Sequence, residues 1–587
     1  MTQGDDRYLG RHTLTPSSQL ERHVALIALL FAFQSAGAAP LHLDFLHEID
    51  GRPLSPSSLR YKNSSRESYS LTRLEWLATG FIIKTNSGDS YSLKETRVFI
   101  PTMGTTISLT GLPEIRISAI TFHIGPDQET NHSDPARYTA NHPLNPNINK
   151  LHWDWQDGYI FIAAEGHWRA AGEKLPGGFG YHFARDSNRT AITLPVDINL
   201  RDETRVAISL DAARLLAGLS FAKDGTTTHS AEGDPVAARL KSNLQTAFRI
   251  AGIQRGGVPT PPNPPDPIDL PANPKGFPIS LPKHVPLPAF PPDNPILTAR
   301  VALGKRLFHE AKLSLGNTMS CASCHQGGTL SDPRRFSPGV HGEHSNRHSM
   351  PLFNLAWKSS FFWDGRAPSL RAQSLRSIEN HLEMDQTLAA AVSKLQLDQT
   401  YPSLFSAAFG SGIISPENIG LAIENFLLTL ISVDSKFDQH LQGKVTLTAE
   451  EQRGLELFYT EFEPRLGKFG ADCFHCHGGA LFTDHSFHNN GLATTDDLGV
   501  GSATGKASDR YKFSTPSLRN IALTAPYMHD GRFATLEEVI DHYSSNFERN
   551  ETLDPNLAKH PSGLRLSGED KNALISFLKT LTDDRLD

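Results

Sequence analysis

Cysteine is scarce in this chain, with four residues among 587. All four lie in two short motifs, CASCH at Cys321–His325 and CFHCH at Cys473–His477. A domain held together by disulfides needs cysteines spread along the chain. The sequence therefore excludes a disulfide framework and assigns its cysteines to two local sites.

An excess of positive charge and a long hydrophobic run are also missing. The chain has 56 Lys and Arg against 63 Asp and Glu, a formal net charge of −7, which gives no general attraction to nucleic acid. No apolar run reaches the roughly 20 residues that a membrane helix needs. A chain of 587 residues is too long for one hydrophobic core, so we expect two to four domains, with neither a nucleic-acid partner nor a membrane span.

The N-terminal residues have the features of an export signal. Arg22 and His23 precede the apolar run VALIALLFAF, and the triplet AGA at 36–38 gives a small-x-small cleavage pattern. We predict that residues 1–38 are a signal peptide and that the mature protein is periplasmic. A short buried helix is the alternative for the apolar run.

Both cysteine pairs are spaced for covalent attachment of haem. In C-x-x-C-H the two thiols add to the haem vinyl groups, and the adjacent histidine reaches the iron. A dithiol redox motif needs no following histidine, and a four-cysteine zinc site does not explain why histidine follows both pairs. The sequence therefore predicts two covalent c-type haems, held by Cys321, Cys324 and His325 and by Cys473, Cys476 and His477.

The sequence around the two motifs is repeated. LTARVALGKRLF from Leu297 and LTAEEQRGLELF from Leu447 share the pattern LTA-x4-G-x2-LF. Two later segments match at helical spacing, the first with Ala422, Phe426, Leu427 and Leu430 and the second with Ala573, Phe577, Leu578 and Leu581. We predict two all-α cytochrome c-like domains at 296–440 and 441–587.

The residues before this repeat are rich in strand patterns and then in proline. AITLPVDINL alternates apolar residues from Ile192 to Leu200, TNSGDS gives a hairpin signal, and DPVAARLKSNLQTAF is the one clear helix. We predict an all-β sandwich at 39–253. Residues 254–295 favour extended polyproline geometry and form either a semi-rigid linker or a strap along the haem domains.

Two segments resemble a known family. FFWDGRAPSLRAQSLRSIENHLEM and TPSLRNIALTAPYMHDGRFATLEEVIDHY are similar to the bacterial di-haem cytochrome c peroxidases, including MauG, which matures a tryptophan-derived cofactor. The resemblance spans 296–587 and implies a peroxidatic haem in the first domain and an electron-transfer haem in the second. It implies that Trp363 relays electrons between the haems. It also places Gln373 and Glu383 over the open face of the first haem, where a carboxylate can move a peroxide proton. Core packing and a solvated carboxylate are the plain alternatives.

The resemblance also implies a sixth ligand for the second haem. Tyr543 in EEVIDHY occupies a position that is methionine in the peroxidases and tyrosine in MauG. A phenolate stabilises oxidised iron, whereas a thioether raises the reduction potential. The tyrosine therefore favours an enzyme that stores oxidising equivalents on its haems over one that only removes peroxide. Met528 and His542 are the alternative ligands.

A calcium site is the third implication of this family. Thr524 and Pro526 match backbone ligands of the calcium that the family binds between its domains, where carbonyl oxygens suit a hard cation. His348 replaces a ligand asparagine, and Ser377 replaces a proline near the haem. The resemblance therefore implies a calcium cofactor, with an incomplete ligand match.

The strand-rich region resembles a second family. KLHWDWQDGYIF at 150–161, FHIGPD and HPLN are similar to MbnP, a family of periplasmic copper-binding β-sandwich proteins. In that family the MauG-class di-haem protein MbnH oxidises a tryptophan to kynurenine. Alternation places Trp153 and Trp155 on one face of the strand and His152 on the other. Either tryptophan is a candidate substrate, and core packing is the alternative.

The histidines of this region are the candidate copper ligands. Imidazole suits copper, and kynurenine would add a carbonyl and an aryl amine. Any of six histidines could be an ordinary surface or core residue: His47, His123, His152, His167, His182 and His229. The candidates selected are His47, His152 and His229.

Two functions are compatible with these features. In the first, the chain uses hydrogen peroxide to oxidise a tryptophan of its own N-terminal domain and so matures a copper site. In the second, it is a di-haem peroxidase that takes electrons from a small cytochrome or cupredoxin, with the sandwich as an independent copper-binding or docking module. Tyr543 and the covalent tethering of the two regions favour the first.

Overall fold

The computed structural model describes residues 12–13, 40–55, 59–139, 141–153, 158–256, 270–271, 273–328, 330–463, 467–492, 496–560 and 562–583. These form two compact units, one of residues 1–22, 264–547 and 562–587 and the other of residues 23–263 and 548–561. The predicted signal peptide lies outside the described residues except for β1 (His12–Thr13), which pairs with β17 (Ser280–Leu281). Much of the proline-rich linker, 257–269, also lies outside them. No helix in the described part of the chain is long and apolar enough to cross a membrane.

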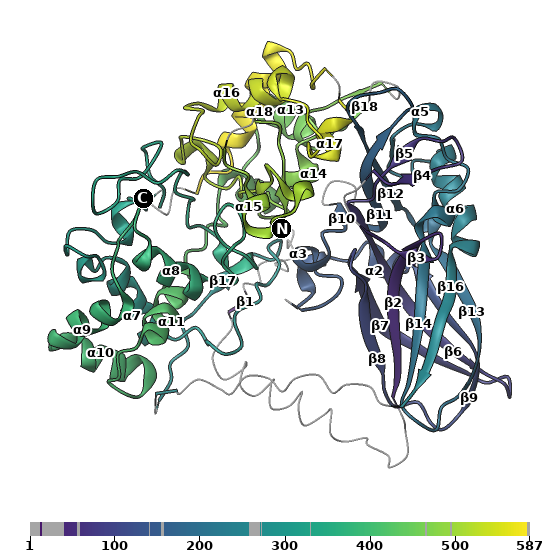
Figure 1. Cartoon of the computed structure of the whole chain (residues 1–587), viewed down its shortest axis with the longest axis horizontal. Coiled ribbons are helices and arrows are strands. Elements are labelled where there is room, and N and C mark those ends of the chain that lie inside the picture. Colours follow the sequence, from purple (N-terminus) through teal and green to yellow (C-terminus); the bar gives the residue numbers. More distant parts are fainter. Residues whose placement is uncertain are drawn as a thin grey trace, which may run out of the picture. The chain divides into compact units, whose positions relative to one another are not determined.

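The second unit is a sandwich of two β-sheets (Figure 1). The larger sheet contains β4 (Tyr61–Lys62), β5 (Ser68–Tyr69), β6 (Arg73–Thr85), β7 (Ser90–Ile100), β9 (Arg116–Ile124), β10 (His152–Trp153), β11 (Gly158–Arg169), β12 (Gly177–Ala184), β13 (Thr190–Asn199) and β15 (Thr227–Thr228). The smaller sheet contains β2 (Leu41–Ile49), β3 (Arg52–Pro53), β8 (Thr105–Leu109), β14 (Thr204–Asp211) and β16 (Phe248–Arg255). Short helices join the strands: α2 (Gln128–Asn131), α3 (Pro146–Asn149), α4 (Ala212–Leu215) and α5 (Phe221–Asp224).

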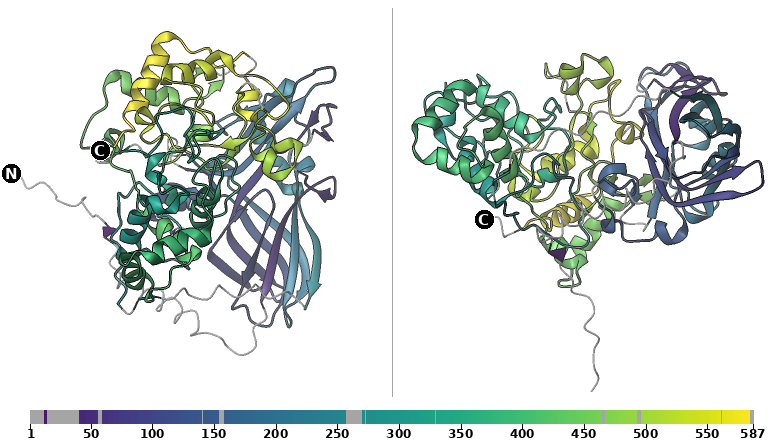
Figure 2. Two further views of the ribbon diagram at one scale, coloured as in Figure 1. Left: turned by 60° about the vertical axis from the view of Figure 1, so that its left-hand side comes forward. Right: turned by 90° about the horizontal axis from the view of Figure 1, so that it is seen from below.

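Aromatic side chains from both sheets form one core. Trp76 and Phe122 of the larger sheet meet Phe45 and Phe248 of the smaller sheet, with ring centroids 5.4 Å apart for Phe45 and Trp76 and 5.1 Å apart for Trp76 and Phe248. Edge-to-face contacts of this kind add to the stabilisation that burial alone supplies. The right-hand view of Figure 2 shows the strands of this unit curving around that core.

Three local sequence predictions for the sandwich are confirmed. Strand β13 buries the alternate residues Ile192, Leu194 and Ile198. The predicted hairpin joins β6 to β7, whose strands pair antiparallel. The predicted helix is α6 (Pro235–Ala247), which begins after the N-cap residue Asp234.

The first unit carries both cysteine motifs and is mainly helical (Figure 1). Its helices are α7 (Thr298–Phe308), α8 (Leu370–Glu379), α9 (Leu388–Leu397), α10 (Thr400–Phe409), α11 (Pro416–Leu427), α12 (Lys436–Leu441), α13 (Ala449–Tyr459), α14 (Phe474–His477), α15 (Val500–Thr504), α16 (Leu536–Asp541) and α18 (Gly568–Lys579). The prediction of two purely α-helical domains was too strict, because the unit also contains short ladders. These ladders pair β18 (Phe462–Glu463) with β19 (Lys468–Phe469) and β20 (Phe487–His488) with β21 (Phe513–Ser514).

The sequence repeat corresponds to a repeated helix crossing. Helix α7 packs on α11, and α13 packs on α18. At each crossing the glycine of the LTA-x4-G pattern lies against the backbone of the other helix. A Cβ added to Gly304 would lie 1.8 Å from the Ala422 carbonyl oxygen, and a Cβ added to Gly454 would lie 2.0 Å from the Ala573 carbonyl oxygen. The conserved spacing within the repeat therefore places a residue without a side chain where two helix backbones meet.

One segment near the C-terminus belongs to the sandwich unit. Residues 548–561 include α17 (Pro555–Ala558), which packs on β12 and β11. The His167 imidazole bonds the Leu553 carbonyl oxygen at 2.6 Å, and the Arg549 guanidinium donates to the Pro176 carbonyl at 3.0 Å. The sequence did not predict this interruption of the region 441–587.

Candidate functional site

The first cysteine motif is a compact turn whose histidine has a fixed orientation. Cys321–Ser323 form a 3-10 turn, and the His325 amide donates to the Cys321 carbonyl at 3.0 Å. The His325 Nδ1 contacts the Leu330 carbonyl oxygen at 3.2 Å. When Nδ1 donates to this carbonyl, Nε2 is the nitrogen available to a metal. Burial lowers the pKa of His325, which favours the neutral ring that a metal ion requires.

The second motif repeats this arrangement. Helix α14 carries His477, whose Nδ1 contacts the Phe482 carbonyl oxygen at 3.2 Å, again five residues further along the chain. Leu330 and Phe482 both have left-handed backbones, with φ of 47° and 52°, which turn their carbonyls toward the histidines. The four cysteines form no disulfide, and burial raises the pKa of Cys321 and Cys473 to about 12. Paired thiols that form no disulfide, beside an oriented imidazole, fit covalent c-type haem at both motifs.

Glu383 lies near the first motif. Its negative charge contributes to the raised pKa of both Cys321 and Cys324. Burial raises the pKa of Glu383 itself, although hydrogen bonds from Ser377 and Asn380 oppose the shift. The Asn380 amide donates to Glu383 Oε1 at 2.6 Å. A carboxyl group whose pKa is raised by burial thus lies beside the first haem motif.

Gln373 lines a pocket in the same unit. It lies on α8, and other residues of the pocket wall come from both halves of the unit: Pro351, Lys358, Phe361, His485, Thr515, Pro516 and Arg519. Burial lowers the pKa of Lys358 to about 8, and its ammonium group donates to the Ser514 hydroxyl at 2.9 Å. Gln373 and Glu383 are both half-buried side chains of this unit.

Trp363 lies where the two halves of this unit meet. Its indole nitrogen donates to the His348 carbonyl at 2.8 Å, and its own carbonyl accepts from the Ser514 amide of β21 at 2.8 Å. The side chain is buried, with 7% exposed. Close by in sequence, Arg347 bonds Asp364 of the first half and both carboxylate oxygens of Asp497 in the second, each at 2.7 Å. These ion pairs hold the halves together around the tryptophan.

Tyr543 and Met528 both point toward Asn490. The Asn490 amide lies 3.3 Å from the Tyr543 hydroxyl and 3.4 Å from the Met528 sulfur. His542 instead bonds the Asn490 backbone carbonyl at 2.9 Å. Tyr543 lies in a π-helical turn, His542–Asn546, a distortion that is frequent at functional sites. Tyr543 and Met528 therefore both reach the Asn490 side chain, and both remain candidate ligands of the second haem.

The calcium match does not gain support from the ligand chemistry. Thr524 is buried and Pro526 is half-buried, but His348 directs its ring nitrogens at the Ser331 hydroxyl, 3.4 Å away, and the Arg335 carbonyl, 3.3 Å away. The His348 carbonyl oxygen accepts the Trp363 indole. An imidazole engaged in this way does not replace the oxygen donor of an asparagine.

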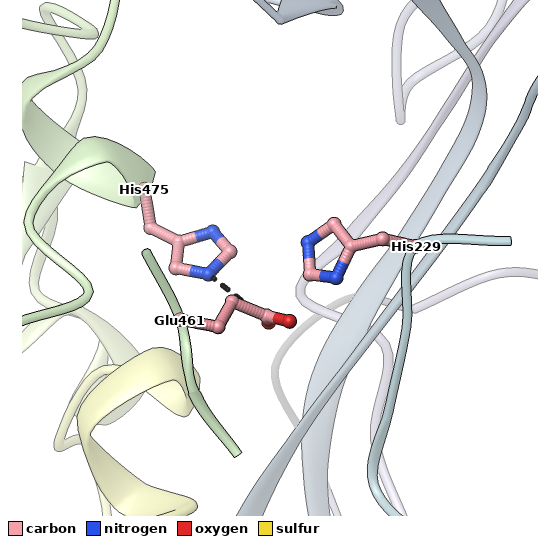
Figure 3. A group of neighbouring side chains, drawn as sticks. All are labelled: His229, Glu461 and His475. Atoms are coloured by element: carbon pink, nitrogen blue, oxygen red, sulfur yellow. Dashed lines mark ion pairs between the residues drawn. The ribbon is translucent and has the colours of Figure 1, made fainter. Parts of the chain in front are cut away.

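A further histidine inside the second motif was not singled out by the sequence. His475, the variable residue of CFHCH, lies 3.0 Å from Asp472 and 3.8 Å from Glu461, and Figure 3 shows the ion pair with Glu461. Figure 3 also labels His229, which belongs to the sandwich unit. His475 and its two carboxylate partners are therefore buried together beside the second haem motif.

The sandwich contains a cluster of one tryptophan and two histidines. Trp153 of β10 is buried, with its ring centroid 5.2 Å from that of His229 and 6.2 Å from that of His182. His182 Nδ1 lies 3.2 Å from His229 Nε2. Trp155 lies outside the described residues. Residues far apart in sequence therefore bring two imidazoles to the face of one candidate tryptophan.

A charged network orients this cluster from behind. His182 Nε2 lies 3.0 Å from Glu165 Oε1, and the Arg73 guanidinium donates to the same carboxylate at 2.8 Å. Glu165 and His182 are both buried. A carboxylate that binds the far nitrogen of an imidazole fixes the ring and its tautomer, the arrangement found behind metal-binding histidines.

The other two candidate copper ligands have different surroundings. His47 bonds the Thr102 carbonyl through Nδ1 and accepts the Trp76 indole through Nε2, both at 2.9 Å, and burial lowers its pKa to about 4. These contacts are those of a core histidine. His152 packs edge-on against Tyr159 at 4.7 Å, on the strand face opposite Trp153. The structure instead pairs His229 with His182, which was not among the three copper candidates chosen from the sequence. The sequence signal for His182 was a single histidine within the apolar strand GFGYHFA.

Comparisons with known proteins agree with both halves of the chain. Residues 298–446 match the family described as di-haem cytochrome c peroxidase, and residues 38–230 match MbnP. The chain is 37% identical over 296 residues to methylamine utilization protein MauG of Methylorubrum extorquens, which covers 50% of this chain and 80% of that protein. It is 32% identical over 312 residues to cytochrome c peroxidase Ccp of Escherichia coli, covering 51% and 61%. A solved structure of a MauG-like protein associated with microbial copper homeostasis is 34% identical, covers 52% of this chain and 95% of that chain, and has a TM-score of 0.47.

Proposed function

Because this chain belongs to the di-haem cytochrome c peroxidase family and carries an MbnP domain ahead of it, we propose that it is a periplasmic enzyme that oxidises its own Trp153. The oxidant is hydrogen peroxide, and the product is kynurenine in a copper site. The observation that carries the proposal is the burial of Trp153 against the paired imidazoles of His182 and His229.

Peroxide activation is assigned to the first haem motif. Cys321, Cys324 and His325 would hold a haem, whose iron would supply the redox centre for peroxide. Glu383 accepts a proton from peroxide and returns it to the departing water, a task that suits its raised pKa. Trp363, buried where the halves of the unit meet, carries electrons between the two haem motifs.

The overall reaction balances with peroxide as the only oxidant. Two molecules of hydrogen peroxide take up four electrons and four protons and become four molecules of water, while two molecules of water supply the two oxygen atoms that the indole gains. The C2–C3 bond of the indole breaks, and the ring becomes N-formylkynurenine. Water then releases formate and leaves kynurenine. Four electrons pass from the tryptophan to peroxide through the haem unit.

The product would complete a copper site in the sandwich. Kynurenine at position 153 adds an aryl amine and a carbonyl beside His182 and His229. Two imidazoles with these groups form a ligand set that suits copper. Glu165 and Arg73 would hold His182 in place for the metal.

Peptide mapping of the holoprotein before and after peroxide tests the proposal. We expect the mass change of kynurenine formation within Leu151–Phe161, lost in Trp153→Phe and retained in Trp168→Phe, a matched tryptophan of the same sandwich. Modification of Trp155 in the Trp153→Phe variant would move the site by two residues. An unmodified peptide in protein that turns over peroxide rapidly with a reduced small cytochrome would instead establish the plain peroxidase function.

A further inference from the structure

Two histidines and an aspartate converge on the surface of the first haem half. His341 Nε2 lies 2.7 Å from Asp385 Oδ2, and His381 Nδ1 lies 3.4 Å from the same oxygen. The two imidazole centroids are 5.1 Å apart. We propose that His341, His381 and Asp385 bind one divalent transition-metal ion, Zn²⁺ or Cu²⁺. This site is separate from both haem motifs and does not depend on the proposed oxidation of tryptophan.

The ligand chemistry selects the class of ion. Two imidazoles and a carboxylate are a common donor set for Zn²⁺ and Cu²⁺, whereas Ca²⁺ and Mg²⁺ require mostly oxygen ligands. Glu343 Oε2 lies 3.7 Å from the other ring nitrogen of His381 and adds a second negative charge next to the cluster. Three protein ligands leave a fourth position of a tetrahedral site to water.

The spacing of the donor atoms is close to that of a bound state. The ligand atoms all lie within 4.8 Å of one another. Around a tetrahedral ion with bonds of about 2.0–2.1 Å, ligand atoms are about 3.3 Å apart. The side chains are partly exposed, with 40% of His341, 65% of His381 and 30% of Asp385 accessible. They are therefore free to rotate by the small amount that closure around an ion requires.

The backbone holds the two contributing loops in register. The Val340 amide donates to the Glu383 carbonyl at 2.8 Å, and the Gly339 amide donates to the Glu343 carbonyl at 2.7 Å. Gly339 also passes so close to Leu382 that a Cβ would lie 2.4 Å from its carbonyl oxygen. Asp385 has φ of 44°, an uncommon conformation for a residue with a side chain. The loops are thus fixed before any ion binds, which lowers the entropic cost of binding.

An ion bound at this cluster would connect the loop that carries Glu383 to the neighbouring loop. His381 and Asp385 flank Glu383, the carboxylate assigned to peroxide, and His341 lies on the neighbouring loop. A metal ion would join these loops covalently through coordination bonds. It would therefore stabilise the segment that carries Glu383 against local opening.

Titration of the full-length holoprotein with Zn²⁺ tests the site. By calorimetry we expect wild-type protein to bind one more Zn²⁺ per chain than His341→Ala or His381→Ala, or to bind it at least about tenfold more tightly. His309→Ala is the matched control, because His309 is an exposed histidine of the same half whose Nδ1 bonds its own helix, and it should bind as wild type. Zn²⁺ should also raise the melting temperature of wild type and His309→Ala more than that of the two site variants.

Electron paramagnetic resonance with one equivalent of Cu²⁺ reports the ligands independently. Nitrogen hyperfine splitting from two imidazoles should appear in wild type and change in each site variant. The haem absorption spectrum checks that the variants are folded. Equal Zn²⁺ stoichiometry and affinity in wild type, His341→Ala and His381→Ala, all folded, would overturn the proposal.

Discussion

At the residue scale, burial makes the Glu383 carboxyl group harder to ionise. An exposed glutamate is ionised at neutral pH, but burial penalises the charge and raises the pKa of Glu383. Removing its proton therefore costs more in the folded chain than in the unfolded chain. Its contribution to stability falls as pH rises from the ordinary glutamate pKa toward the raised one.

The pH dependence of the peroxide reaction tests this role. Because the carboxylate is the base, the rate should fall as pH drops through the raised pKa of Glu383. Glu383→Gln should remove this limb and slow the reaction by about 10²–10⁴-fold. Stopped-flow absorbance across pH measures both effects, and Glu379→Gln, an exposed glutamate on α8, should keep the wild-type profile. A pH limb that persists in Glu383→Gln would assign the base elsewhere.

Tyr543 and Met528 offer opposite electronic properties at one position. If the phenolate binds iron, Tyr543→Met should raise the reduction potential of the second haem, because a thioether favours reduced iron. Met528→Leu should then leave that potential unchanged. Spectroelectrochemical titration distinguishes the two haems. A potential that shifts in Met528→Leu but not in Tyr543→Met would make methionine the ligand.

At the scale of elements, the two helix crossings are the most exacting parts of the haem unit. Gly304 and Gly454 let α7 and α13 approach α11 and α18 more closely than any side chain permits. A glycine within a helix is otherwise unfavourable by about 1 kcal/mol relative to alanine. Its presence in both repeats therefore reflects packing between helices and not the preference of one helix.

Alanine substitution separates these two effects. Gly304→Ala and Gly454→Ala should each destabilise the protein by about 1–3 kcal/mol, since the new methyl group overlaps a backbone carbonyl. Gly568→Ala, at a helical glycine with nothing within 4 Å of the added Cβ, should be neutral or slightly stabilising. Denaturant unfolding followed by circular dichroism measures the difference. Equal stability of all three variants would mean that the helices separate without cost.

At the scale of the whole molecule, the proposed function places enzyme and substrate in one chain. The segment 548–561 leaves the helical unit five residues after Tyr543 and packs on strands β11 and β12 of the sandwich. Contacts such as His167 to Leu553 hold this segment on the sandwich, so the chain connects the two units at both ends of the segment as well as through the proline-rich linker. Such tethering raises the effective concentration of a protein substrate into the millimolar range.

Modification should therefore occur within one chain. Trp153→Phe supplies an active haem unit without a substrate, and Trp363→Phe supplies a substrate with impaired electron relay. In an equimolar mixture with peroxide, we expect Trp153 of the second variant to stay unmodified, and the wild-type rate per chain to be independent of protein concentration. Quantitative peptide mapping measures both. Modified Trp153 in the mixture would show that one chain acts on another.

The sequence by itself determined the features that depend on neighbouring residues. The C-x-x-C-H motifs, the repeated glycine, the strand alternation of β13 and the helix α6 all follow from spacing within one element. Only the tertiary structure decided which distant side chains meet. It joined His182 to His229 and Trp153, gave His47 to the Trp76 indole, assigned 548–561 to the sandwich, and brought His341 to His381. Strand pairing and loop contacts depend on register and burial over tens to hundreds of residues, which no local pattern encodes.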